Sequence, residues 1–124
     1  VGAGQRALWD AFVAWAGSAD VLVNNAGDAA APMGMGELVE DIWDLTFQVN
    51  VKAPVILMQA PMPLMQDAVW GRIGNISSII GVKYGGGVTT AHYSASKAAL
   101  GAMTCSYAKE GAPQTSSSTP FALG

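Results

Sequence analysis

Two short strand-like segments separated by a long helical pattern constrain the fold of this chain most strongly. Val21-Leu22-Val23 is a continuous apolar run, and Asn24-Asn25-Ala26-Gly27 brings it to an end. Such a run is typical of a strand that is buried on both faces of a parallel sheet. A second strand is predicted over Arg72 to Ser77, following Trp70-Gly71.

Helical patterns alternate with these two strands. Gln5 to Ala16 has apolar residues at helical spacing, and Ala91 to Lys109 is predicted as the last helix. Glu37 to about Gln66 also follows the helical period, but a proline inside a helix costs about 3 kcal/mol, so we expect a kink or break near Pro61. Gly81 to Thr90 is predicted to be a glycine-rich loop. The order helix, strand, helix, strand, helix indicates right-handed crossovers and a parallel α/β sheet.

Composition excludes several classes of protein. The chain has 124 residues, of which 51% are hydrophobic and 12% charged, so we expect a folded domain and not a disordered chain. The net charge is −3 and there is no basic run, which argues against binding to nucleic acid or to anionic membranes. No signal peptide or membrane-spanning run is found. Cys105 is the single cysteine and His92 the single histidine, so we expect no internal disulfide, a cytoplasmic location and no metal site.

Tyr93 and Lys97 are the first candidates for a chemical role. They are four residues apart in a predicted helix and therefore project from the same helical face. A cation beside a phenol favours the phenolate, so such a pair can act as a general acid and base near neutral pH. The alternative is an ordinary helix with a packed tyrosine and a solvated lysine.

Two serines, one asparagine and one glycine are further candidates for a role in the site. Ser78 follows the second strand at the carboxyl edge, where α/β proteins bind ligands, and a hydroxyl there can donate to a substrate oxygen. Ser77, the last residue of the predicted strand, is the competing candidate. The residues alone do not decide between the two serines, and either could cap the strand end instead. Asn50 lies in a predicted helix although asparagine is a mediocre helix former, so it has either a functional role or a place on a solvated face. Gly27 permits a close backbone approach.

Taken in chain order, Asn24-Asn25-Ala26-Gly27, Asn50, Ser77-Ser78 and Tyr93 to Lys97 resemble the short-chain dehydrogenase/reductase family. The resemblance covers about Ala3 to Pro113. It implies a partial Rossmann-like, doubly wound parallel sheet with flanking helices in three layers. It also implies NAD- or NADP-dependent hydride transfer between an alcohol and a carbonyl, with a 3-ketoacyl reductase-like activity as the nearest guess.

The resemblance implies a role for each position. Tyr93 would donate the proton, and Lys97 would support it and bind the nicotinamide ribose. Ser78, in preference to Ser77, would donate to the substrate oxygen, and Asn50 would hold a water that relays protons to the lysine. The expected catalytic residues are therefore Asn50, Ser78, Tyr93 and Lys97. The expected cofactor-binding residues are Asn24, Asn25, Ala26, Gly27, Tyr93 and Lys97, with Asn25 bracing the central sheet.

Part of the family pattern has no counterpart in this sequence. Gly2-Ala3-Gly4 is not a dinucleotide fingerprint, because no strand precedes it and the third glycine is missing. We expect residues 1–113 to form a partial domain and residues 114–124 to be an irregular or frame-altered tail. An inactive truncated relative that docks with a homologue, or a partial sequence, remains the alternative.

Self-association is a further expectation. Two strands make a poor sheet on their own, and a parallel sheet needs cover on both faces. Apolar surface should therefore be exposed and should favour association. By resemblance, the chain is expected to form a homo-oligomer through its long helices.

Overall fold

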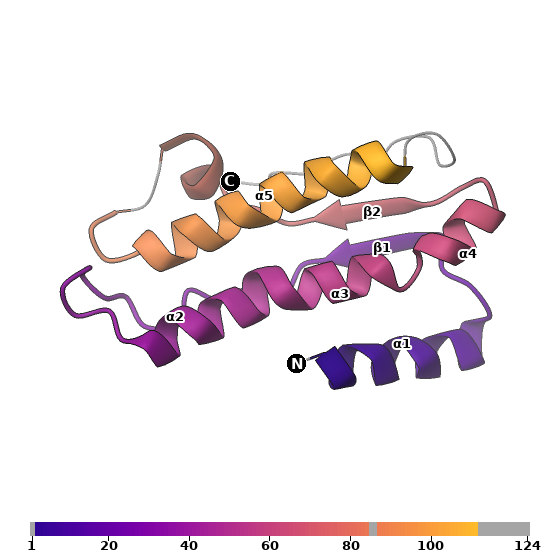
Figure 1. The fold of residues 1–124 in the computed structure, drawn as a ribbon, viewed down its shortest axis with the longest axis horizontal. Helices are drawn as coiled ribbons and strands as arrows, with labels where there is room; N and C mark the ends of the chain where they lie inside the picture. Colours follow the sequence, from indigo (N-terminus) through magenta and orange to yellow (C-terminus); the bar gives the residue numbers. More distant parts are fainter. Residues whose placement is uncertain (1, 85–86, 112–124) are drawn as a thin grey trace.

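The computed structural model describes residues 2–84 and 87–111, and the tail predicted over 114–124 lies outside this range. The predicted order of helices and strands is confirmed (Figure 1). The elements are α1 (Gly2–Ala16), β1 (Val21–Asn24), α2 (Glu40–Phe47), the π-helical turn η1 (Gln48–Lys52), α3 (Ala53–Gln59), α4 (Met62–Asp67), β2 (Arg72–Asn75), the π-helical turn η2 (Ile80–Tyr84) and α5 (Ala91–Gly111).

The two strands form the predicted parallel pair. Val21 lies opposite Arg72, and Asn24 lies opposite Asn75. Helices α3 and α5 pack against one face of this pair, and α1 lies alongside α3. The described residues therefore supply two layers of the expected three-layer architecture.

Strand β1 is not buried on both faces, so that part of the prediction is wrong. Leu22 packs toward the helices, whereas Val21 is 56% and Val23 58% exposed. Successive side chains of a strand point to opposite faces, and no described element covers the second face. Val21 and Val23 would be buried only if a further layer covered this face of the sheet, and the described residues do not supply one.

The long helical pattern is divided by two different features. The break predicted near Pro61 is confirmed, because α3 ends at Gln59, α4 begins at Met62 and Pro61 is fully buried between them. The π-helical turn η1 was not predicted, and it separates α2 from α3 without ending the rod (Figure 1). Turns of this kind frequently occur at functional sites.

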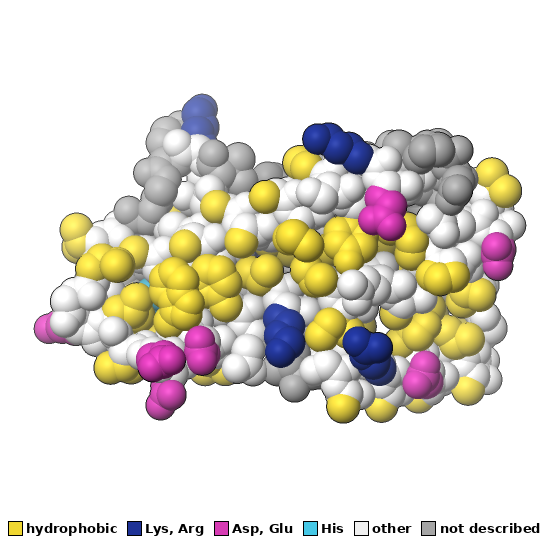
Figure 2. Space-filling view, in the orientation of Figure 1, with side chains coloured by type: hydrophobic (Ala, Val, Ile, Leu, Met, Phe, Trp, Pro, Cys, Tyr) yellow, Lys and Arg dark blue, Asp and Glu magenta, His cyan; other side chains and the backbone are white. Residues whose placement is uncertain are grey.

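A band of apolar side chains remains exposed on the helical face of the molecule. Figure 2 shows this band along the groove between α5 and the rod formed by α2, η1 and α3. The apolar lining of the groove is Phe47, Val51, Val55 and Met103, and its polar lining is Asp44, Gln48 and Lys52. Phe47 stacks on the ring of Trp43 at a centroid distance of 4.6 Å. The expectation of exposed apolar surface is confirmed for the described residues.

The apolar core is small and a polar network extends it. Met58, Met65 and Ile73 are its buried hydrophobic cluster. Next to it, the Asn24 side chain donates to Asn75 Oδ1 at 2.8 Å, and Asn75 Nδ2 donates to Thr104 Oγ1 at 2.9 Å. These bonds connect both strands to α5.

The network corrects one sequence prediction. Asn24, and not Asn25, braces the sheet, because Asn24 is 6% exposed and bonded across the strands while Asn25 is exposed. Asn24 lies two residues after Leu22 and therefore shares its inward face.

We predict that Asn75→Ala lowers the free energy of unfolding by about 2–4 kcal/mol, because the buried Asn24 amide loses its acceptor and Thr104 Oγ1 loses the donor from Asn75. Urea unfolding followed by circular dichroism measures this change. Ser106→Ala is the control, since its exposed hydroxyl bonds only to the backbone of its own helix, and we expect a change within about 0.5 kcal/mol. Similar losses in the two variants would contradict the assignment.

Candidate active site

Lys97 lies at the centre of the candidate site. Its side chain is 3% exposed, and its Nζ donates to the carbonyl oxygen of Ile76 at 2.9 Å. Ile76 directly follows β2, so this bond fixes the ammonium group at the carboxyl edge of the sheet. Burial lowers the pKa of Lys97 below its ordinary value of 10.5, because desolvation disfavours the charged form.

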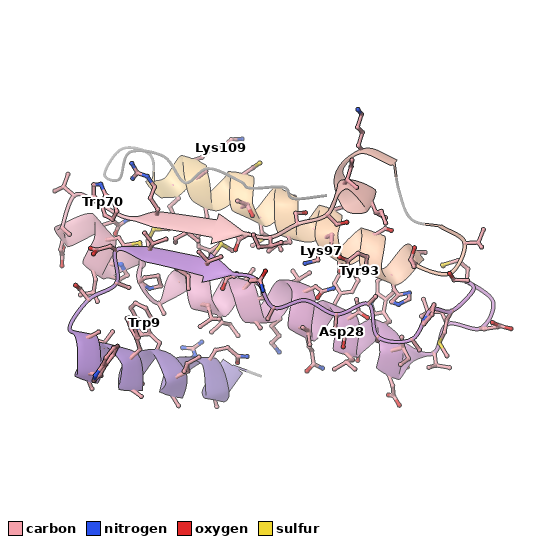
Figure 3. All side chains as sticks on the ribbon, turned by 180° about the vertical axis from the view of Figure 1, so that it is seen from behind. Trp9, Asp28, Trp70, Tyr93, Lys97 and Lys109 are labelled. Carbon is pink, nitrogen blue, oxygen red and sulfur yellow. The ribbon has the colours of Figure 1, made fainter. Side chains whose placement is uncertain are left out.

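Tyr93 lies one helical turn before Lys97 on the same face of α5, as predicted. The Lys97 Nζ is 5.8 Å from the centroid of the Tyr93 ring. Figure 3 shows both side chains just past the arrowheads of β1 and β2. The alternative with a solvated lysine is wrong.

The two serines after β2 have different partners. The Ser77 hydroxyl donates to the carbonyl oxygen of Lys97 at 3.1 Å, so its proton is committed to holding α5. Ser78 Oγ instead accepts from the backbone N–H of Ile80 at 3.3 Å. Within the described part of the chain, no acceptor takes the Ser78 proton. This contrast separates two residues that the sequence alone could not rank.

Asn50 is fully buried in the π-helical turn η1, so the alternative of a solvated face is wrong. Its Oδ1 accepts from the N–H of Asp28 at 2.8 Å, and its Nδ2 donates to the carbonyl oxygen of Asp28 at 2.7 Å. The same Nδ2 donates to Ser96 Oγ at 2.9 Å. Both amide protons are therefore used in hydrogen bonds, and the side chain fixes the backbone that follows β1.

The turn after β1 closes on the lysine through its glycine. A Cβ atom at Gly27 would lie 2.8 Å from Lys97 Nζ and 3.4 Å from Asn50 Oδ1, so a side chain there would displace the ammonium group. Asn25, Ala26 and Gly27 are exposed, while the Asn24 side chain turns away into the sheet. Of the four predicted cofactor-binding residues in this turn, the last three lie at the surface of the site.

Two buried residues of the site were missed in the sequence. His92 is 0% exposed with its Nε2 2.7 Å from the carbonyl oxygen of Ala29. Ser96 is also 0% exposed, and its hydroxyl donates to the carbonyl oxygen of Tyr93 at 2.7 Å. One feature of the sequence could have identified them as a pair: they are four residues apart and therefore lie on the same helical face.

We predict that replacing Lys97 with methionine removes a pH-dependent part of the stability. The folded-state pKa of Lys97 is depressed, so the unfolded chain binds more protons in the interval just below pH 10.5, and the free energy of unfolding should rise with pH there. Relative to Lys97→Met, the unmodified chain should gain stability as pH increases through this interval in urea titrations. Lys109→Met, at an exposed position, is the control. Parallel curves for the unmodified chain and Lys97→Met would contradict the burial of a charged group.

Solved structures similar to this chain include two with nicotinamide cofactors. A metagenomic short-chain oxidoreductase in complex with NADP superposes with a TM-score of 0.90 at 33% identity, covering 100% of this chain and 55% of that one. NAD⁺-bound xylitol dehydrogenase gives a TM-score of 0.85 at 30% identity, covering 93% of this chain and 44% of that one. Both comparisons confirm the Rossmann-like α/β fold.

Sequence comparisons agree with the structural ones. The 3-oxoacyl-[acyl-carrier-protein] reductase FabG of Aquifex aeolicus is 38% identical over 95 residues, which are 77% of this chain and 37% of the relative. Human dehydrogenase/reductase SDR family member 4 is 34% identical over 98 residues, or 79% of this chain and 34% of the relative. The chain thus spans little more than a third of the length of these relatives. The short chain dehydrogenase model matches residues 3–116, so the chain belongs to the short-chain dehydrogenase/reductase family.

Proposed function

We propose that this site serves NAD(P)-dependent hydride transfer between an alcohol and its carbonyl. The observation that carries the proposal is the buried ammonium group of Lys97 beside the Tyr93 ring at the carboxyl edge of the sheet. That edge is where open α/β sheets bind their ligands. Family membership supports the same reaction class.

The residues present fit the nicotinamide end of the cofactor. Lys97 has three N–H donors and gives one to Ile76, which leaves donors for ribose hydroxyl groups. The residues from Asn25 to Gly27 are exposed, and Gly27 lies next to this amine, where its missing Cβ permits a close approach. When bound, the cofactor supplies or accepts the hydride. Both NAD and NADP remain within the proposal, because the similar structures include one with each.

Proton transfer is assigned to Tyr93. In the reducing direction its phenol gives a proton to the substrate oxygen as the carbonyl becomes an alcohol, and in the oxidising direction the phenolate takes that proton back. The positive charge of Lys97 favours the phenolate. Ser78 donates a hydrogen bond to the same substrate oxygen, a choice supported by the commitment of the Ser77 proton to Lys97.

Asn50 has a narrower role than the family resemblance implied. Because both of its amide protons are committed, a water that relays protons to Lys97 has to donate to an oxygen atom of Asn50. We therefore retain Asn50 among the proposed catalytic residues. Its side chain holds the Asp28 backbone in place, and its oxygen atoms are available to a water that relays protons.

The first substrates to test are 3-oxoacyl thioesters, since one of the similar curated proteins is a 3-oxoacyl-[acyl-carrier-protein] reductase. A cytoplasmic location also belongs to the proposal and depends on the single cysteine. The truncated interaction module is the less favoured alternative, because it has no need of a buried lysine beside a tyrosine.

We predict that a Ser78→Ala variant loses turnover while Ser77→Ala retains it, and that Tyr93→Phe lowers kcat by about 10²–10⁴-fold. Spectrophotometric oxidation of NADH and NADPH with a 3-oxoacyl thioester measures turnover, and nicotinamide fluorescence measures cofactor binding. Retained turnover in Tyr93→Phe would contradict the proton-transfer role. Absence of cofactor binding, together with tight uptake by a full-length homologue, would favour the interaction module.

We also propose that the chain forms a homo-oligomer through the exposed groove between α5 and the rod of α2, η1 and α3. The groove measures about 470 Å³ and is largely apolar, and Trp43 at its margin is 38% exposed. In the described ranges, no helix combines the length and apolar character needed to cross a bilayer. A second copy of the chain is the occupant that buries two such grooves together.

We predict that light scattering at micromolar concentration finds a dimer or larger assembly, and that Met103→Glu shifts it toward monomer by placing a charge in the groove. Val88→Glu is the control, because Val88 is 87% exposed and does not line the groove. A monomer for the unmodified chain would contradict this assembly.

A further inference from the structure

His92, the sole histidine of the chain, has a buried imidazole ring with one nitrogen bonded and the other without a partner among the described residues. It is completely buried, and its Nε2 lies 2.7 Å from the carbonyl oxygen of Ala29. Since a carbonyl oxygen only accepts, Nε2 carries the proton and donates. Its Nδ1 is buried with no hydrogen-bond partner among the described residues. An unpartnered buried polar atom costs about 1–3 kcal/mol, a cost that an aliphatic side chain would avoid.

The bond of His92 completes a clamp on the backbone that follows β1. Asn50 already holds both the N–H and the carbonyl oxygen of Asp28, and Ser96 holds Asn50. His92 and Ser96 are four residues apart on the inner face of α5, so both act from one helical face. Three of the four backbone polar groups of Asp28 and Ala29 are therefore held by buried side chains.

The backbone just after the clamp is strained. Ala30 has a φ of 50°, a left-handed conformation that is uncommon for a residue with a Cβ atom. The Asp28 carboxylate accepts from the Ala30 N–H at 2.8 Å, and the N–H of Met33 donates to the carbonyl oxygen of Thr89 at 2.9 Å. Strained positions of this kind persist only when surrounding contacts hold them. The clamp supplies such contacts.

Holding this loop has a direct consequence for the lysine. Gly27 immediately precedes Asp28, and its Cα faces the Lys97 ammonium so closely that a Cβ atom would lie 2.8 Å from Nζ. We infer that His92 is a positioning residue, whose bond to Ala29 keeps the Gly27 turn closed over Lys97. The catalytic meaning of this closure rests on the proposed function, but the closure itself does not.

The titration of Lys97 reports this closure. If the turn opens, water reaches the ammonium group and its depressed pKa should rise toward 10.5. We expect this rise in His92→Leu, which fills the space but cannot donate. In His92→Gln, the amide N–H can take the place of the imidazole Nε2–H, so the pKa of Lys97 should remain low. Nuclear magnetic resonance of the chain with ¹³C-labelled lysine measures the titration of its four lysines.

Thr104→Val is the matched control. Thr104 lies on the same buried stripe of α5 and bonds to Asn75, so its loss should lower stability without changing the Lys97 titration. Equal pKa values of Lys97 in the Leu and Gln variants would overturn the inference. If His92→Leu does not fold, His92→Asn replaces it, because its shorter amide reaches the Nδ1 position and not Nε2. Equal values in the Asn and Gln variants would then overturn the inference in the same way.

The readout separates this inference from the proposed function. The measurement is a titration and requires neither cofactor nor turnover. A chain without oxidoreductase activity can still show the difference between the Leu and Gln variants. Conversely, an active enzyme in which both variants titrate alike would retain the proposed function and lose the role of His92.

Discussion

Three segments that are distant in the sequence meet at the buried ammonium group of Lys97. The carbonyl oxygen of Ile76 after β2 accepts its hydrogen bond, and Gly27 after β1 packs against it without a side chain. Ser77 donates to the backbone carbonyl of the same lysine. Burying a charged group is unfavourable unless it is bonded, so the bond to Ile76 has to form as the turn at Gly27 covers the ammonium group. The geometry of the candidate site follows from this requirement.

The same contacts serve stability and chemistry. The buried hydrophobic cluster of Met58, Met65 and Ile73 is small for the length of the chain, and hydrogen-bonded asparagine, serine and threonine side chains occupy much of the remaining interior. Such a network stabilises the fold only when its members are satisfied. The side-chain bonds that fix Asp28 and Ala29 therefore also fix the position of the turn that faces Lys97. A substitution among the side chains that hold Asp28 and Ala29 should affect folding and the site at once.

Much of the architecture could be predicted from the sequence, because apolar periodicity and Pro61 fix the order of the elements. The inner face of α5 could not be predicted in this way. His92, Ser96 and Thr104 are buried on that face. A pattern that identifies inward-facing positions by their apolar residues does not identify these three, because they are polar. The choice of Asn24 over Asn25 was available by counting two residues from Leu22. The roles of Ser77 and Ser78 depend on hydrogen bonds between distant segments, which no local pattern contains.

The burial of Lys97 is the central claim, and the acetylation rates of individual lysines test it most directly. Lys52, Lys83 and Lys109 are exposed and serve as internal references in the same sample. The lowered pKa gives Lys97 more of the neutral amine that acetylating reagents attack, but its 3% exposed side chain is out of their reach. Mass spectrometry after brief treatment at neutral pH should therefore find Lys97 protected relative to these three, and Gly27→Ala should remove the protection by displacing the ammonium group. Acetylation of Lys97 at the rate of Lys52 in the unmodified chain would contradict the account.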